Sequence, residues 1–322
     1  MVEKFSWVPA IILIVIIAVA GGGSAIFVYY HNVVHPAAAP LVVVEGVNVT
    51  VNYIGIFGSG PEEGKVFDTS LYSVGSNDAA YAKSLEFHAR GIAKNYTPLD
   101  VHVGGNTPSS GYTLGNYSFI QVVTGFWQGL LGLPGNETHT VVVPPNLGYG
   151  PKNPACIAEQ PLTYTLPVLE MLPGPTFSHQ YPGIVATTGA SFNDPRYGWP
   201  VLILSANASF VTIENEPSVG TTASPAGWPV LVTSVTSTGN GTGTITLENQ
   251  LSSSQAGHLL GKDFAGTGPC TTQAHGQFIV TAVDPANGTY TEDYNTEVTG
   301  QTLLFDVTVV DIFLPVAAAT AA

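Results

Sequence analysis

The residues best suited to chemistry in this chain are aromatic rings accompanied by a few polar groups, and they stand in short glycine-containing strings. Phe67 precedes Asp68 within residues 64–70, and Tyr149 lies between two glycines, which indicates a tight turn that presents the ring. The eight histidines are scattered and show no metal-ligand spacing. These residue types predict an apolar, ring-lined pocket without a metal or a cofactor.

Two strands and one short helix must position these rings. Residues 49–56 and 303–310 are runs of β-branched or aromatic side chains of strand length, and both are typical of buried strands. Residues 126–133 carry apolar side chains at the spacing of a short amphipathic helix. A short helix packed on a curved antiparallel sheet is a half-barrel, so we predict the α+β class with a concave apolar groove.

The stretch between residues 70 and 125 allows two alignments of a central strand. Residues 98–104 alternate like a strand, and residues 112–115 offer a rival. Residues 78–93, which precede both, are compatible with a helix.

Five strings in the correct order resemble the FKBP-type peptidyl-prolyl cis-trans isomerases, and the last is similar to the closing strand of that family. The resemblance implies an FKBP-like antiparallel half-barrel with one short helix, interrupted by a large β-rich insertion. We interpret the chain as a membrane-anchored, archaeal form of the family. The strings are VNYIG at 51–55, GKVFDTS at 64–70, GFWQGLLG at 125–132, VVVPPNLGYG at 141–150 and GQTLLFDVTVV at 300–310.

The resemblance also implies a proline-binding pocket among these strings. Phe126 would form its floor, although a small register shift would exchange this ring for Trp127. The Tyr149 hydroxyl and the Val123 N–H would donate to the substrate carbonyl, and Asp68 would border the twisting amide. The catalytic positions fall at Tyr53, Phe67, Asp68, Val123, Phe126, Tyr149 and Phe305, and the substrate-binding positions at Leu99, Val122, Leu147 and Trp127.

Isomerising an X-Pro bond needs no nucleophile, metal or cofactor. The barrier of roughly 18–20 kcal/mol arises from amide resonance, which twisting the C–N bond destroys. An apolar pocket favours the twisted amide because its dipole is smaller, and fixed donors can hold the displaced carbonyl. Core packing is the alternative interpretation of Phe67, Phe126 and Phe305, and a side-chain-stabilised turn is the alternative for Asp68.

A long insertion separates the Tyr149 turn from the closing strand. SlyD-type members of the family carry an insert-in-flap domain at this place, a β-rich module that grips unfolded chains. Residues 198–202 (GWPVL) recur at 227–231, and residues 276–283 repeat the strand pattern. Repeated strand-turn-strand units predict a β-sandwich or small barrel with almost no helix.

The chain is thereby divided into four parts. Residues 1–40 form an anchor and a Pro/Ala spacer, and residues 41–157 with 298–316 form the isomerase domain. Residues 158–297 form the insert-in-flap-like domain, and residues 317–322 form a tail.

The N-terminal segment predicts passage through a membrane. Residues 8–30 contain no charged side chain and are long enough to cross a bilayer as a helix. Residues 18–20 (AVA) also fit a signal-peptide cleavage site, but the apolar run resumes after residues 21–23, which favours a retained anchor. We therefore expect a single-pass protein of the cell membrane whose body is extracytoplasmic.

Two further features suit an extracytoplasmic body. Cys156 and Cys270, the only cysteines, are compatible with one disulfide. Asn-x-Ser/Thr sequences predict glycosylation, although a chain rich in Thr and Asn can generate such sequences without any glycan. The predicted glycosylation sites are Asn48, Asn95, Asn116, Asn136, Asn207, Asn240 and Asn287.

Charge limits the partners of the protein. The 22 acidic residues exceed the eight basic ones and no basic cluster occurs, so a nucleic-acid partner is not expected. We expect proline-containing unfolded or secreted polypeptides as partners, together with the membrane through the N-terminal helix. The preferred function is a prolyl isomerase with chaperone (holdase) activity. The alternative is a non-catalytic peptide-binding or structural cell-surface protein on an FKBP-like scaffold.

Overall fold

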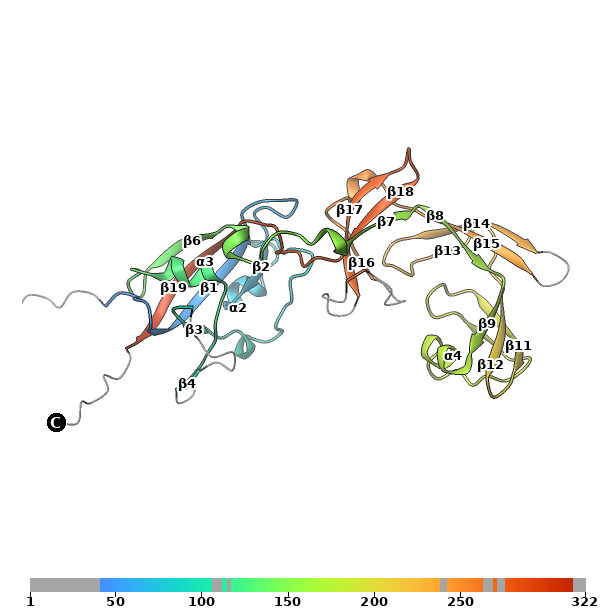
Figure 1. Ribbon diagram of the computed structural model, residues 1–322, viewed down its shortest axis with the longest axis horizontal. Helices are drawn as coiled ribbons and strands as arrows, with labels where there is room; N and C mark the ends of the chain where they lie inside the picture. The colour runs from blue at the N-terminus through green and yellow to red at the C-terminus, as the bar shows by residue number, and fades with distance from the viewer. Residues whose placement is uncertain are drawn as a thin grey trace, which may run out of the picture.

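A computed structural model describes residues 41–105, 112–114, 117–237, 242–262, 269–270 and 276–314 (Figure 1). The fold is mostly β, with 43% strand and 12% helix, and its sheets are antiparallel. The α+β prediction is therefore wrong, because the insertion adds many strands while the helices span at most seven residues. The α-helices are α2 (Tyr72–Gly75), α3 (Thr124–Leu130) and α4 (Gly174–Gln180), and the 3₁₀ helices are η2 (Ala93–Asn95), η3 (Pro145–Leu147), η4 (Pro154–Cys156) and η5 (Ser253–Gln255).

One curved sheet, which we call the barrel, contains the first and last described long strands. It consists of β1 (Asn48–Phe57), β2 (Val66–Thr69), β3 (Leu99–His102), β6 (Thr138–Val143) and β19 (Leu303–Phe313). The order is β2-β1-β19-β6, and β3 pairs with β1. β1 and β19 pair along their whole length, from Asn48 opposite Phe313 to Phe57 opposite Leu303. The predicted closing strand is therefore confirmed.

Helix α3 covers the barrel sheet through small residues. A Cβ atom built on Gly129 would lie 2.1 Å from Val141 Cγ1, and one on Gly125 would lie 2.8 Å from Val143 Cγ1. The helix therefore reaches β6 only because glycine occupies both positions. Below it, alternate residues of β1 and β19 such as Val51 and Val307 are fully buried, as expected for strands with one core face.

The region between β2 and α3 corrects one expectation and resolves another. Residues 78–93 form no α-helix, because Asn77 Oδ1 accepts the Ala80 N–H and Lys83 Nζ donates to the Val74 and Tyr81 carbonyls. Such local side-chain bonds compete with helical ones. The strand that joins the barrel sheet is the one predicted within residues 98–104, where β3 pairs with β1, and the rival stretch forms a separate hairpin. That hairpin consists of β4 (Tyr112–Leu114) and β5 (Tyr117–Phe119).

The insertion contains three four-stranded sheets in place of the predicted sandwich or single barrel (Figure 1). Three strands lead outward and three groups of three strands return, and each returning group pairs with one outgoing strand. The proximal module is β7 (Ile157–Pro161), β16 (Leu260–Lys262), β17 (Gln277–Asp284) and β18 (Thr289–Asp293). The middle module is β8 (Thr163–Pro167), β13 (Thr222–Ala223), β14 (Val230–Ser237) and β15 (Gly243–Asn249). The distal module is β9 (Leu169–Pro173), β10 (Ser191–Asn193), β11 (Pro200–Ala206) and β12 (Phe210–Asn215).

The modules are repeats of one another. Pro161, Pro167 and Pro173 end the three outgoing strands at a spacing of six residues, and each outgoing strand is the last one in its sheet order. Proline is tolerated there because an edge strand has N–H groups that need no ladder partner. The GWPVL echo marks the start of β11 and of β14, as repeated strand units require. Each repeat therefore forms its own four-stranded sheet, made of one outgoing strand and the three strands of one returning group.

Each joint between modules uses the same contacts. Val168 lies between β8 and β9, where the middle module meets the distal one. Its N–H donates to the Gly243 carbonyl of the middle module at 2.9 Å, and the Val168 carbonyl accepts the Asn215 N–H of the distal module at 2.8 Å. Trp199 Nε1 donates to Asn215 Oδ1 at 3.1 Å, which pairs a buried indole with a buried amide. The joint before the middle module repeats these bonds with Leu162, Gly288, Asn249 and Trp228.

No helix within the described ranges has both the length and the apolar character needed to cross a bilayer. That finding contradicts the expected single-pass location at the cell membrane, which had depended on residues 8–30. Those residues lie outside the described ranges, as do the spacer up to residue 40 and the tail.

Candidate functional site

Four rings from four elements meet at one end of the barrel core. Phe126 of α3 and Phe305 of β19 have ring centroids 4.8 Å apart, and Phe67 of β2 lies 5.5 Å from Phe305. Tyr53 of β1 lies 6.4 Å from Phe126 and 6.3 Å from Phe305. All but one of these contacts are edge-on, the geometry that aromatic pairs prefer. We call this set the ring cluster.

The sequence places Phe67 in the cluster through a glycine on the neighbouring strand. A Cβ built on Gly55 would lie 2.6 Å from the Phe67 ring, so the ring covers β1 only where no side chain stands. Asp68 pairs with Gly55, and the register then shifts so that Ile56 pairs with Val66 and Phe67 has no partner on β1. Phe67 is half-buried, whereas Tyr53, Phe126 and Phe305 are at most 6% exposed. The cluster therefore borders solvent at Phe67.

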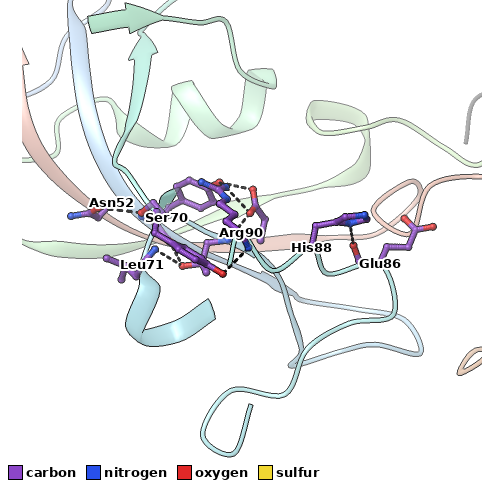
Figure 2. A network of polar contacts seen from close by, with 10 residues as sticks. Asn52, Ser70, Leu71, Glu86, His88 and Arg90 are labelled. Atoms are coloured by element: carbon purple, nitrogen blue, oxygen red, sulfur yellow. Dashed lines mark hydrogen bonds and ion pairs between the residues drawn. The ribbon is translucent and has the colours of Figure 1, made fainter. Parts of the chain in front are cut away.

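A polar network adjoins the ring cluster, and part of it is drawn in Figure 2. The Tyr53 hydroxyl donates to Asp68 Oδ2, and Arg90 Nη2 donates to Asp68 Oδ1 at 2.8 Å and to the Tyr53 hydroxyl oxygen at 3.0 Å. Burial, followed by the charge of Asp68, raises the pKa of Tyr53. The tyrosine therefore remains a proton donor, and Asp68 is held by two donors.

Backbone bonds fix Asp68 from below. Its Oδ1 also accepts the Thr69 N–H at 2.8 Å, while the Thr69 hydroxyl and the Ser70 N–H both donate to the Tyr53 carbonyl. The Ser70 hydroxyl accepts the Tyr53 N–H at 2.9 Å and donates to Asn52 Oδ1, as Figure 2 shows. Asp68 therefore stabilises the local backbone with its side chain and also borders the ring cluster through Tyr53.

Arg90 is the member of this network that sequence reasoning missed. It lies in an irregular segment that gives no periodic signal. The available signal was composition, because Arg90 is one of only two arginines in the chain. Its guanidinium lies 5.8 Å from the Tyr96 ring centroid, and its backbone N–H donates to the Tyr96 hydroxyl at 2.9 Å.

The start of α3 presents an open backbone donor. The Val123 carbonyl accepts the Phe126 N–H at 3.0 Å, but within the described part of the chain the Val123 N–H donates to no protein acceptor. Val123 and Val122 are half-buried against the barrel core. Trp127 is half-buried there too, so Phe126 rather than Trp127 occupies the ring cluster.

The remaining predicted residues lie on β3, on η3 and in the turn that follows η3. Leu99 is half-buried on β3, and Leu147 of η3 packs against the glycine that opens α3. Tyr149 is 51% exposed, and among the described residues its hydroxyl has no hydrogen-bond partner. Partial burial of the ring, followed by the charge of Asp68, raises the pKa of Tyr149. Tyr149 therefore offers a neutral hydroxyl near Asp68.

The arrangement is an aromatic wall with few polar groups. No group of three or more His, Cys, Asp or Glu side chains suited to holding a metal occurs in the described ranges. The described residues offer hydrogen-bond donors from Val123, Tyr149 and Arg90 around half-buried apolar side chains. Such a site can bind an apolar ring and stabilise a displaced carbonyl.

The predicted modification sites are dispersed. Cys156 and Cys270 form a disulfide with Cα atoms 5.1 Å apart, which ties the start of the insertion, at η4, to the β16–β17 connection. Asn48 is half-buried, and its side chain bonds to His102 at 2.7 Å. Asn116 and Asn240 lie outside the described residues. The exposed predicted sites are Asn95, Asn136, Asn207 and Asn287.

Comparison with protein-family profiles and with curated proteins finds no match.

Proposed function

We propose that this protein is a peptidyl-prolyl cis-trans isomerase whose site is the ring cluster with its polar border. The observation that carries the proposal is that Phe67, Phe126 and Phe305 come together with Asp68 at their border, although more than two hundred residues separate the first from the last. The open Val123 N–H stands at the start of the helix that carries Phe126. Core packing alone gives no reason for an adjacent carboxylate held by three donors.

Each group has a role in this reaction. The proline ring lies against the half-buried Phe67 and Val122, with Phe126 behind them, so that water is excluded from the amide. The Val123 N–H and the Tyr149 hydroxyl donate to the carbonyl that precedes proline, and these bonds strengthen as twisting localises charge on that oxygen. Arg90 compensates the charge of Asp68, so the carboxylate does not repel the carbonyl.

The test is cis/trans exchange of an X-Pro peptide, measured by NMR with the full-length protein. Wild-type protein accelerates exchange, and Tyr149→Phe and Asp68→Ala each lower kcat/KM. Tyr117→Phe is the matched control, because Tyr117 of β5 is also an exposed tyrosine, but its ring lies against Phe313. A folded wild-type protein that leaves the exchange rate unchanged sinks the proposal.

A second activity, holding unfolded chains, is favoured by the outer face of the distal module. Met171, Leu204 and Phe210 are 67%, 39% and 43% exposed on β9, β11 and β12. Met171 pairs with Thr212, and Phe210 pairs with Pro173 at the end of β9. Apolar side chains gathered on one sheet face suit capture of apolar segments.

Substitution tests the holding activity without removing the insertion. Met171→Ser combined with Phe210→Ser leaves the module's buried face intact and weakens suppression of aggregation of a reduced, unfolded client. Val219→Ser, at a 61% exposed residue outside the strands, serves as the control. Unchanged suppression by the double variant contradicts the holding role of this face.

A further inference from the structure

The segment that carries Arg90 has no strand or helix of its own. Its start is fixed by an isolated bridge between Lys83 and Val66, the first residue of β2. Its end is η2, and residues 84–92 between them contain only a turn and irregular backbone. The position of Arg90 therefore depends on contacts made by individual residues along the segment.

Glu297 binds the middle of this segment. Glu297 Oε1 accepts the Leu85 N–H at 3.0 Å, and Oε2 accepts the Glu86 N–H at 3.1 Å. The Glu297 N–H in turn donates to Glu86 Oε2 at 3.0 Å. Glu297 is only 8% exposed, and hydrogen bonds to a carboxylate are stronger than neutral ones. We call these three bonds the clasp.

The clasp joins the Arg90 segment to the exit of the insertion. Asn295, two residues before Glu297, exchanges bonds with the Asn153 backbone at 2.8 and 3.1 Å. Lys152 Nζ donates to the buried Asp293 Oδ2 at 2.6 Å. The chain segments that enter and leave the insertion are thus bound to each other. We call these segments, residues 152–153 and 293–297, the neck. Glu297 belongs to the neck and takes its position from it.

Beyond the clasp the segment runs directly to the candidate site. In Figure 2, Glu86, His88 and Arg90 follow one another along it, and Arg90 lies at the end next to Ser70. After Arg90, the Asn95 side chain donates to the Arg90 carbonyl at 2.6 Å. Arg90 is therefore held between the clasp on one side and η2 on the other.

We propose that Glu297 is a positioning residue for the isomerase site, acting through the clasp to place Arg90 against Tyr53 and Asp68. This inference rests on the proposed function. The insertion then supports the isomerase site as well as providing a separate binding region. A shift of the neck would move Leu85 and Glu86, and the Arg90 guanidinium would move with them.

The competing role for the clasp is simple attachment of the insertion to the barrel. Attachment predicts that loss of Glu297 lowers stability, with no special relation to Arg90. Positioning predicts that the effects of substituting Glu297 and Arg90 on kcat/KM are not additive. If Glu297 acts only through Arg90, removing Glu297 costs nothing further once Arg90 is absent. A double-mutant cycle separates the two roles.

The experiment uses the full-length protein with Glu297→Gln, Glu297→Ala, Arg90→Ala and the double variant Glu297→Ala/Arg90→Ala. Arg90→Ala and Glu297→Ala each lower kcat/KM for an X-Pro peptide by about tenfold, and the double variant loses no more than Arg90→Ala. Glu297→Gln gives an intermediate loss, because its amide oxygen keeps one of the two backbone bonds. Thr296→Val is the matched control, since among the described residues Thr296 bonds only to Thr299 in the same turn.

A second measurement is independent of catalysis. ¹⁵N NMR of the Arg90 side chain reports restricted, slowly exchanging Nη–H groups while they bond to Asp68. Those signals broaden or move in Glu297→Ala and Glu297→Gln and stay in place in Thr296→Val. If wild-type protein does not isomerise the peptide, the proposed function fails, while the Arg90 signals still decide the positioning role.

Two results overturn the inference. One is an additive loss of kcat/KM in the double variant, and the other is an unchanged Arg90 signal in Glu297→Gln. If Glu297→Ala does not fold, Glu297→Gln, which preserves size and shape, takes its place in the cycle with Arg90→Ala.

Discussion

Two Tyr–Asp–Arg trios lie in different regions of the molecule, and the same residue types have different surroundings in each. In the barrel trio the aspartate side chain is 41% exposed and the arginine 32%. In the distal trio the aspartate is 1% exposed and the arginine 28%. The barrel trio is Tyr53, Asp68 and Arg90, and the distal trio is Tyr181, Asp194 and Arg196.

The buried aspartate of the distal trio is occupied by its own fold. Asp194 Oδ1 accepts the N–H groups of Arg196 and Tyr197 at 2.7 and 2.9 Å, and Oδ2 accepts from the Tyr181 hydroxyl at 3.2 Å. The Tyr197 ring stacks on Trp199 at 4.3 Å. This carboxylate fixes the β10–β11 connection and has no face left for a ligand.

The comparison shows that the trio alone does not mark a site. The barrel trio differs because its carboxylate is accessible and because the charge of that carboxylate acts on Tyr149, whose hydroxyl has no protein partner in the described residues. The distal trio predicts a stability role, and the barrel trio predicts a role in binding and turnover.

The largest expected effect is on stability, from Asp194→Ala. Removing the buried carboxylate leaves Arg196 and two backbone N–H groups without their acceptor, which costs about 3 kcal/mol of unfolding free energy. Hydrogen exchange of β11 and β12 amides and thermal denaturation measure the loss. Asp284→Ala, which opens an exposed turn of the proximal module, is the control and has the smaller effect. Equal losses would contradict the structural assignment of the distal trio.

The next effect is on turnover, from Asp68→Ala. Asp68 is well exposed, so its ion pair with Arg90 contributes less than about 1 kcal/mol to unfolding free energy. The same change lowers kcat/KM about tenfold because Arg90 and Tyr53 lose their common acceptor. Denaturant unfolding and peptide exchange, run on the same sample, test both statements. A large stability loss with intact turnover would make the two trios equivalent.

The grouping of the barrel rings was predictable because the rings lie in short local strings. Phe67 and Asp68 lie on β2 and Phe126 lies in the first turn of α3, and the order of their strings, through its resemblance to a known family, predicted that they share one pocket. Arg90 was not predictable in this way, since an irregular segment has no period and its partners Tyr53 and Asp68 are distant in sequence.

The insertion was predicted less well for a related reason. The echo of Trp199 at Trp228 revealed repeated strands, but the outgoing strands pair with segments far along the chain. Only the spacing of Pro161, Pro167 and Pro173 recorded that arrangement in the sequence. Non-local pairing of this kind also explains why the predicted α+β class was wrong and the fold is mostly β: most of the described strands, β7 to β18, belong to the insertion.

A smaller difference between the trios is expected when each tyrosine hydroxyl is removed. Tyr53→Phe leaves the Arg90–Asp68 pair in place and lowers kcat/KM about threefold. Tyr181→Phe removes one donor to a buried carboxylate, costs about 1 kcal/mol of unfolding free energy and leaves kcat/KM unchanged. Steady-state exchange rates and urea unfolding check the pair. A catalytic loss in Tyr181→Phe would extend the functional region into the distal module.

The smallest effect is a pH dependence at the junction of the two regions. Burial raises the pKa of Glu297, an effect that the nearby charge of Glu86 reinforces and that the bonds from the Glu86 and Leu85 N–H groups oppose. A carboxyl whose pKa is higher in the folded state than in the unfolded chain binds more protons when folded, so its contribution to stability improves as the pH falls from neutral towards the ordinary glutamate pKa. Glu297→Gln lacks this proton. Urea unfolding of both proteins at several pH values should therefore show the stability of wild-type protein rising relative to that of Glu297→Gln as the medium becomes more acidic. The opposite slope would mean that the clasp bonds lower the pKa of Glu297 by more than burial raises it. Ionisation of this carboxyl would then strengthen the clasp rather than weaken it.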